Sequence, residues 1–296
     1  MIKYMRMWVL ANICIISLKY ATAQISELAT DPVIFEGAYT ADVYSVLNGG
    51  IEQKSGYLGM ANIRLAFDTK NGRLWNNGLV FVNAVCTHGL SPSEAAGDFQ
   101  VTSNIDASGD HMYIQECWYK QSLGYVDVTA GLQDLNAEFL VCEGGGQFIN
   151  SSFGVPSVVS ENIPVPIFPL TTLGLSLKWN ISKKIAWQCA LFDGAPYDFS
   201  QNNMYILNWE INKDDGAFGI TELALKGKIF RKSMVCKLGA YYHSKLNQID
   251  ETSGQMETVF ENNNGLYAIA DQNLWSNEDT TRKVDYFIQF AASPKS

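Results

Sequence analysis

The most constraining feature of this sequence is a segment in which side-chain polarity changes at every residue. In Leu173–Trp179, leucine or tryptophan alternates with glycine, serine or lysine. Successive side chains of a strand point to opposite faces, so one face of this segment is apolar and the other is polar. Similar segments recur along the chain. A sheet built from them separates an apolar medium from water, as the wall of a transmembrane β-barrel does.

Eleven segments of 7 to 13 residues are predicted strands, close to the length that a tilted transmembrane strand needs. They are Phe35–Leu47, Tyr57–Asp68, Leu79–His88, Met112–Lys120, Val126–Leu135, Leu173–Trp179, Ile185–Phe192, Gly219–Ile229, Met234–His243, Leu266–Gln272 and Val284–Ala291. The predicted fold class is therefore all-β, an antiparallel transmembrane β-barrel. A soluble β-sandwich also alternates and stays the alternative. Strand length and aromatic residues near strand ends favour the barrel.

The first 23 residues are predicted to be a signal peptide. Lys3 and Arg6 charge its start, Met7–Leu18 form a short apolar core, and Ala21-Thr22-Ala23 offers a cleavage site. The core of about 12 residues is shorter than the roughly 20 that a membrane-spanning helix needs. Residues 24–296 are therefore expected to form the exported domain.

Charge and cysteine content exclude several classes of partner. The chain has 21 basic and 30 acidic residues, which argues against nucleic acid as a partner. The cysteines beyond the leader follow no metal-binding spacing and are most simply small apolar strand residues. No cofactor and no metal site are expected.

A membrane-embedded enzyme is the main rival class. The histidines are His88, His111 and His243, and none stands in an arrangement with Ser, Asp or Glu that differs from chance. The sequence has no Gly-x-Ser-x-Gly motif. We therefore expect a protein that is not an enzyme.

The connections between the predicted strands are unequal. Ser182-Lys183-Lys184 is a tight polar turn, whereas Ser91–Asp110 and Phe139–Pro169 are long loops. Outer-membrane barrels alternate short periplasmic turns with long loops in this way. A loop of about 30 residues in a compact domain is expected to be functional, and inside a barrel it can narrow the lumen.

Many short segments also match one known family in order and spacing. They are Tyr57–Thr69, Phe81–Ala84, Thr87–Gly89, Ser91-Pro92-Ser93, Gly97–Gln100, Ser103–Ile105, Gly131–Phe139, Phe148–Gly154, Phe168–Gly174, Phe192-Asp193-Gly194 and Gly265–Gln272. With these segments the chain resembles the carbohydrate-selective porins, the OprB family. The resemblance covers nearly all of residues 24–296.

The resemblance implies a porin of the bacterial outer membrane that lets monosaccharides and related small sugars diffuse into the periplasm. The implied fold is a sixteen-stranded barrel, with residues of about 139–169 as its constriction loop. Family members continue beyond the point that corresponds to Ser296, so the eleven strands are expected to form an incomplete barrel, its N-terminal two-thirds. An open sheet in lipid leaves costly unpaired edges.

Three alternatives follow for the activity and the partners. In the first, the chain is a sugar porin in contact with outer-membrane lipid, alone or as a homo-oligomer. In the second, it is a non-functional or split-gene fragment that needs a complementing C-terminal fragment. More remotely, it is a soluble secreted sugar-binding β protein, which would need a dry core on one face of its sheets.

A sugar pore needs weak contacts from polar and aromatic side chains near its narrowest part. Alternation around Ile63 and Leu65 turns the neighbouring polar residues of that strand toward the lumen, and Trp118 shares a face with two charged residues. The predicted pore-lining and sugar-contact residues are Asn62, Arg64, Asp68, Glu116, Trp118, Lys120, Asn136, Glu138, Glu143 and Asn150. Each has a structural alternative: an ion pair within the wall, a core or interface aromatic, or a turn-forming residue.

Overall fold

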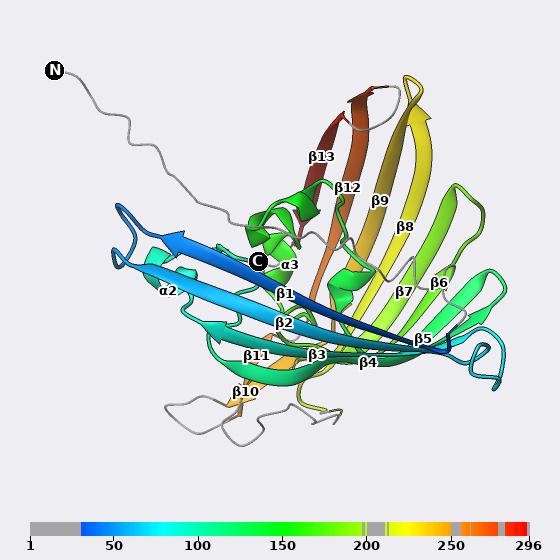
Figure 1. Ribbon diagram of the computed structural model, residues 1–296, viewed down its shortest axis with the longest axis horizontal. Helices are drawn as coiled ribbons and strands as arrows, with labels where there is room; N and C mark the ends of the chain where they lie inside the picture. The colour runs from blue at the N-terminus through cyan, green and yellow to red at the C-terminus, as the bar shows by residue number, and fades with distance from the viewer. Residues whose placement is uncertain are drawn as a thin grey trace.

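The computed structural model is dominated by one antiparallel sheet of eleven strands that follow each other in chain order (Figure 1). It describes residues 31–196, 199, 211, 213–249, 256–260, 262–277 and 282–294; the predicted signal peptide, residues 1–23, lies outside the described residues. The strands of the sheet are β1 (Val33–Ser45), β2 (Ser55–Asp68), β3 (Gly78–Gly89), β4 (His111–Leu123), β5 (Val126–Gln133), β6 (Thr172–Trp179), β7 (Ile185–Asp193), β8 (Ala217–Ile229), β9 (Lys232–His243), β12 (Asn263–Ser276) and β13 (Lys283–Ala292).

The eleven predicted strands correspond one by one to these strands, which confirms the all-β antiparallel fold. The ends differ by a few residues because local caps decide where pairing stops. The strand predicted to reach Leu135 ends at Gln133, since the Asp134 side chain accepts from the Asn136 N–H and begins the short 3-10 helix η2 (Leu135–Ala137). Two further strands, β10 (Leu246–Ile249) and β11 (Met256–Phe260), form a separate small sheet that alternation did not reveal.

The two faces of the large sheet differ as the alternation predicts. We call the face that carries Lys178, Glu222 and Asp271 the inner face, and the opposite face the outer face. Leu175 of β6 is 55% exposed on the outer face. Exposed apolar side chains continue across that face; they include Phe35, Ile63, Leu175, Leu191, Leu238, Ile288 and Phe290. A continuous apolar surface of this kind marks contact with lipid or with another protein.

Long and short connections lie at opposite ends of the sheet, because antiparallel strands in chain order turn at alternate ends. One end has short turns at residues 124–125, 180–184 and 230–231. The other end carries the long connections at residues 90–110, which contain α2 (Pro92–Ala96), and at residues 134–171. The predicted alternation of turns and loops is therefore present.

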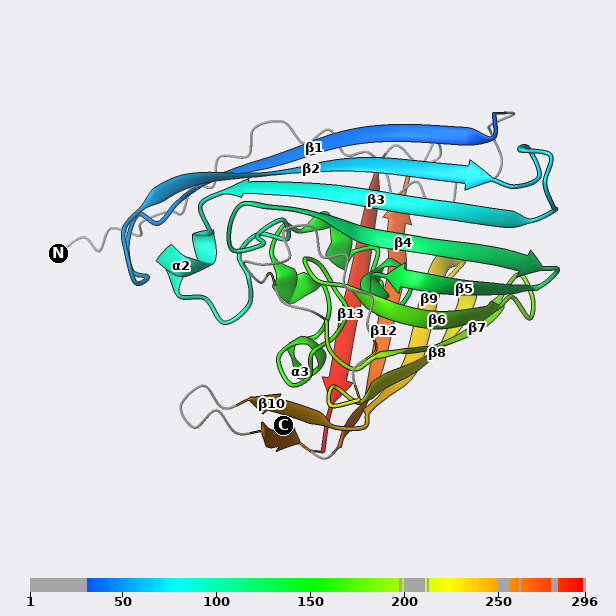
Figure 2. The same ribbon diagram turned by 90° about the horizontal axis from the view of Figure 1, so that it is seen from below.

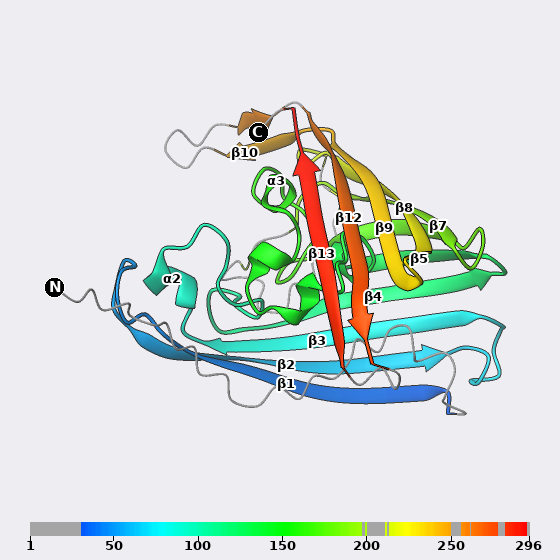
Figure 3. The same ribbon diagram turned by 90° about the horizontal axis from the view of Figure 1, so that it is seen from above.

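The connection between β5 and β6, residues 134–171, turns back inside the curve of the sheet (Figures 2 and 3). We call it the inner segment. It contains η2, η3 (Gly145–Gln147), η4 (Ser151–Phe153) and α3 (Ser157–Ser160). No helix in the described ranges is long and apolar enough to cross a membrane.

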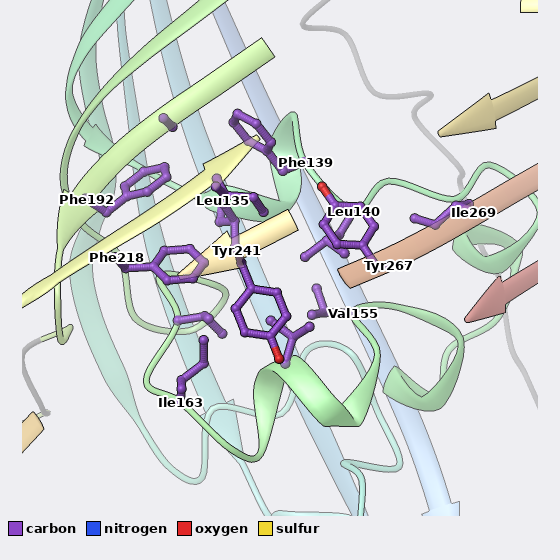
Figure 4. Packing of buried hydrophobic residues seen from close by; sticks show 14 of the residues in the cluster. Leu135, Phe139, Leu140, Val155, Ile163, Phe192, Phe218, Tyr241, Tyr267 and Ile269 are labelled. Carbon is purple, nitrogen blue, oxygen red and sulfur yellow. The ribbon is translucent and has the colours of Figure 1, made fainter. Parts of the chain in front are cut away.

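The main apolar core lies between the inner segment and the inner face of β7, β8, β9 and β12 (Figure 4). Leu135, Phe139, Leu140, Val155, Val159 and Ile163 come from the segment, and Phe192, Phe218, Tyr241, Tyr267 and Ile269 come from the strands. Burial of this apolar area holds the segment against the wall.

The first and last strands of the sheet are its two edges. Among the described residues, β1 pairs with β2 alone, and β13 pairs with β12 alone. The outward backbone groups of these two strands are therefore available to further strands.

Candidate functional site

The inner face of β2, β3 and β4 brings four of the predicted residues together. Arg64 pairs in register with Asn83, and Asn83 pairs with Glu116, so these side chains form a row across three strands. Trp118 lies two positions further along β4, and its Nε1 donates to Glu116 Oε1 at 3.1 Å. Lys120 Nζ is 5.4 Å from the centroid of the Trp118 ring. Alternation alone had placed these residues on one face.

The Trp118 ring packs on an aromatic neighbour that the sequence did not single out. Phe81 of β3 pairs with Trp118, and the two ring centroids lie 4.8 Å apart with 25° between their planes. Gly131 of β5 lies opposite Trp118 at a φ of 134°, and a Cβ at this position would meet the Cys117 carbonyl oxygen at 2.3 Å. Glycine therefore lets β5 approach the backbone of β4 beside the tryptophan.

This arrangement can hold a polyhydroxylated ring weakly. The Phe81–Trp118 pair offers an aromatic surface, and the Glu116 carboxylate accepts hydrogen bonds while Arg64 and Lys120 donate them. Phe81 itself is buried and Trp118 is half-buried, so the tryptophan is the accessible ring.

Asn62 and Asp68 lie on the same inner face of β2. Asn62 is 5% exposed, within the wall rather than on its surface. Asp68 is in register with Leu79, and Leu79 with Lys120, so Asp68 belongs to the same row as Lys120, two rows from that of Arg64. Asp68 Oδ1 also accepts from the Asn71 N–H at 2.7 Å and caps the turn that follows.

Two predicted asparagines have structural contacts within the inner segment. The Asn136 side-chain amide donates to the Phe139 carbonyl at 3.1 Å. Asn150 Oδ1 accepts from the Ser152 N–H at 2.9 Å and caps η4. The contact of Asn136 fits the turn-forming alternative given for it, and Asn150 makes the same kind of local contact.

The two predicted glutamates of the inner segment contact strands of the wall in different ways. Glu138 forms an ion pair with Lys178 of β6 at 2.6 Å. Glu143 is exposed, and its backbone N–H donates to Asp271 Oδ2 of β12 at 3.2 Å. The ten predicted residues therefore fall into one group on β2–β4 and one group on the inner segment.

Sequence reasoning missed a polar group where the inner segment meets β8 and β12. Glu222 is 1% exposed, and Asp271 accepts three hydrogen bonds from the segment. The available signal was alternation, because both carboxylates occupy inward positions of apolar strands. A charge in such a position needs donors around it.

Asp134, where β5 gives way to the inner segment, is a largely buried carboxyl. Its Oδ2 accepts from Gln115 Nε2 at 3.2 Å, and its Oδ1 accepts from the Asn136 N–H at 2.8 Å. Burial, and next the negative charge of Glu116, raise the pKa of Asp134 to about 7. This carboxyl therefore takes up or releases its proton near neutral pH.

Asp134→Asn is expected to flatten the pH dependence of stability between about pH 4 and pH 7. A carboxyl whose pKa is higher in the folded chain stabilises the fold most below its unfolded pKa of 3.8. That stabilisation, at most about 4 kcal/mol, is lost as the pH rises to about 7. The asparagine variant cannot ionise, so its stability should change less than that of the wild type over this pH range.

Urea unfolding in detergent micelles from pH 4 to pH 8 measures how the free energy of unfolding changes with pH in the wild type and in Asp134→Asn. Glu161→Gln, which removes an exposed carboxylate from the same segment, is the control and should keep the wild-type slope. Equal slopes for Asp134→Asn and wild type would contradict the prediction.

Comparison with known proteins connects the fold and the inner face to one family. The sequence model of the carbohydrate-selective porin, OprB family, matches residues 52–296. The high-pH structure of Pseudomonas putida OprB is similar with a TM-score of 0.76 at 20% identity, over 88% of this chain and 66% of that one. The low-pH structure of the same protein has a TM-score of 0.51 at 16% identity, over 89% of this chain and 67% of that one. No curated protein matches.

The chain thus spans about two-thirds of the length of these structures, whose likeness shows a shared fold. The family match extends over most of the sequence, from the connection before β2 to the last residue. The protein belongs to the carbohydrate-selective porin family, the OprB family.

Proposed function

We propose that this protein forms the wall of an outer-membrane pore through which small sugars diffuse passively into the periplasm. The observation that carries the proposal is the division of one curved sheet into an apolar outer face and a charged, aromatic inner face. The apolar outer face suits lipid, and the charged, aromatic inner face suits water and sugar, as in membrane barrels. Membership of a carbohydrate-selective porin family supports the same function.

The sugar contacts we propose centre on Arg64, Glu116, Trp118 and Lys120. The three charged side chains set the local field and exchange hydrogen bonds with hydroxyl groups, while the Trp118 ring offers a stacking face. Such contacts must be weak enough for the sugar to leave, and they make or break no covalent bond. We therefore propose a channel and not an enzyme.

The inner segment supplies the constriction in this proposal. Residues 139–169 lie inside the curve of the sheet and include Glu143 and Asn150, while Asn136 and Glu138 directly precede them (Figure 3). Asp68 is proposed to line the adjoining wall, whereas Asn62, which is 5% exposed, is proposed to be a wall residue that the sugar does not reach. Residues 1–23 are proposed to be the leader that directs export.

A second candidate function is favoured by the two edges of the sheet. β1 and β13 each pair on one side among the described residues, and an unpaired backbone group in lipid costs several kcal/mol. In this version the chain is a partial barrel wall. It conducts once further strands, supplied by a second copy or by a complementing fragment, close the barrel.

The proposal is tested by expressing the chain with its own leader in a Gram-negative host. The proposal expects the chain in the outer-membrane fraction, and expects vesicles that carry it to swell in monosaccharides faster than in larger sugars. Swelling that appears with an added C-terminal fragment alone would select the second candidate. A chain that stays soluble in the periplasm would exclude both.

Trp118→Leu is expected to weaken sugar binding by about fivefold, since an aromatic contact contributes roughly 1 kcal/mol. The sugar concentration that halves the ion current in planar bilayers measures this effect. Trp179→Leu is the matched control, because Trp179 is 44% exposed on the outer face. Equal shifts in both variants would contradict a stacking role for Trp118.

A further inference from the structure

Glu222 of β8 gathers donors from the wall and from the inner segment. Its Oε1 accepts from Gln188 Nε2 at 3.0 Å. Its Oε2 accepts from the Tyr267 hydroxyl at 3.0 Å and from the Leu140 backbone N–H at 3.1 Å. Leu140 has a positive φ of 58°, an uncommon conformation that turns the chain where this N–H meets the carboxylate. One buried carboxylate therefore joins three elements.

Lys237 of β9 reaches the same part of the inner segment. Its Nζ is 4.0 Å from Glu222 Oε1 and donates to the Val141 carbonyl at 2.6 Å. The lysine thus offsets the charge of Glu222 and binds the residue that follows Leu140. Gln188 adds another contact, since its Nε2 also donates to the Glu138 carbonyl at 2.8 Å.

Asp271 of β12 accepts hydrogen bonds from the next three residues of the segment. Its Oδ1 accepts from the Gly144 N–H at 2.9 Å and from Cys142 Sγ at 3.4 Å, and its Oδ2 accepts from the Glu143 N–H at 3.2 Å. The wall therefore binds every residue from 140 to 144 by a backbone or side-chain group.

Carboxylates suit these contacts because they only accept. Both oxygens of Glu222 face donors, and hydrogen bonds to an ionised acceptor are the stronger kind. A glutamine at position 222 would turn its NH₂ group toward one of these donors. Glu222→Gln therefore breaks the hydrogen bonds made by one of the two oxygens and leaves the volume of the side chain unchanged.

The far part of the inner segment is held by the β3–β4 connection. The Ser151 N–H and hydroxyl both donate to the Val101 carbonyl, at 3.1 and 2.7 Å. Asn104 donates to the Ile149 carbonyl through its backbone and to the Phe148 carbonyl through its side chain, at 2.7 and 3.0 Å. The segment thus runs from the β8–β12 wall to the β3–β4 connection.

We propose that Glu222 and Asp271, with Lys237, are positioning residues that clamp residues 140–144 to the wall and thereby set the width of the pore. The aperture role rests on the proposed pore function, whereas the clamp itself can be measured in any folded protein. None of the three was among the predicted pore residues.

Cys142 provides a direct readout of the clamp, because it is 6% exposed and contacts Asp271. The other four described cysteines, Cys86, Cys117, Cys189 and Cys236, pair in register with apolar or small residues of the outer face. Changing these four to alanine leaves Cys142 as the one thiol among the described residues. A variant that also carries Cys142→Ala measures the background labelling without that thiol.

The experiment compares labelling of Cys142 by the uncharged reagent methyl methanethiosulfonate in folded, micelle-bound protein. Glu222→Gln is expected to accelerate labelling by about tenfold, because a lost hydrogen bond to a charged group raises the local open population by that factor. Asp271→Asn should act in the same direction. Glu161→Gln, an exposed residue of the same segment, should label at the wild-type rate.

Unchanged labelling in both folded variants would overturn the clamp. If Glu222→Gln fails to fold, Asp271→Asn, at the less buried carboxylate, decides the matter alone. Single-channel conductance is the second readout: faster labelling with higher conductance supports the aperture role, and faster labelling with wild-type conductance overturns it. A wild-type chain that conducts neither alone nor with an added C-terminal fragment contradicts the proposed pore function and the aperture role with it, while labelling still decides the clamp.

Discussion

Gly239→Ala is expected to lower the free energy of unfolding by about 3 kcal/mol, because it adds an atom where an aromatic ring already lies. Gly239 of β9 pairs with Tyr267 of β12, and a Cβ at position 239 would meet ring atoms of Tyr267 at 2.1 to 2.4 Å. The ring has little room to move, since Tyr267 is 3% exposed within the main core and its hydroxyl donates to Glu222. The alanine therefore costs both packing and a hydrogen bond to a carboxylate.

Gly227→Ala is the matched control for this change. Gly227 lies in β8, has no positive φ, and a Cβ there would have no heavy atom within 4 Å. Alanine at this position should be neutral or stabilising by up to about 1 kcal/mol, since glycine is unfavourable within a strand. Urea unfolding in micelles compares the two variants. A cost at Gly239 no larger than at Gly227 would show that the Tyr267 ring moves aside freely.

The strands were predictable because a single local rule determines them. Side chains such as Leu175 and Ile63 face one medium while Ser176 and Arg64 face another. This difference is visible in the sequence as a change of polarity between consecutive residues. The same rule placed Arg64, Glu116, Trp118 and Lys120 on one face. Applied to β8, the same rule puts Glu222 and Leu223 on opposite faces of the strand. Local alternation is thus enough to orient a side chain.

Partners across the chain were not predictable, because they depend on how the inner segment folds back. Glu222 meets Leu140, and Asp271 meets Gly144, and no local pattern connects these residues. The same limit applies to Asn136 and Asn150, whose side chains turn out to cap local turns of the segment. Alternation gives the side of the wall on which a residue lies. The segment's own path decides what that residue touches.

Ile63→Arg is expected to destabilise the folded protein in lipid by about 2–4 kcal/mol, the cost of an arginine on the lipid face near the middle of a barrel strand. Ile63 is 53% exposed on the outer face of β2, between Gly37 of β1 and Ala84 of β3. Neither small neighbour offers the guanidinium group a hydrogen-bond acceptor in its side chain.

Thr40→Arg on the neighbouring strand is the control, because Thr40 is exposed on the inner face in the same row of side chains as Glu36 and Asp42. An arginine there reaches water and lies two residues from the Asp42 carboxylate, so it should change stability by less than about 1 kcal/mol. The folded fraction in lipid vesicles, read from the heat-dependent shift in gel mobility, measures both variants. A sheet with water on both faces would tolerate the two arginines equally, because each would lie in water. A large difference in folded fraction between Ile63→Arg and Thr40→Arg therefore separates a wall facing lipid from a sheet facing water on both sides. Equal folded fractions would contradict the membrane placement on which the pore depends.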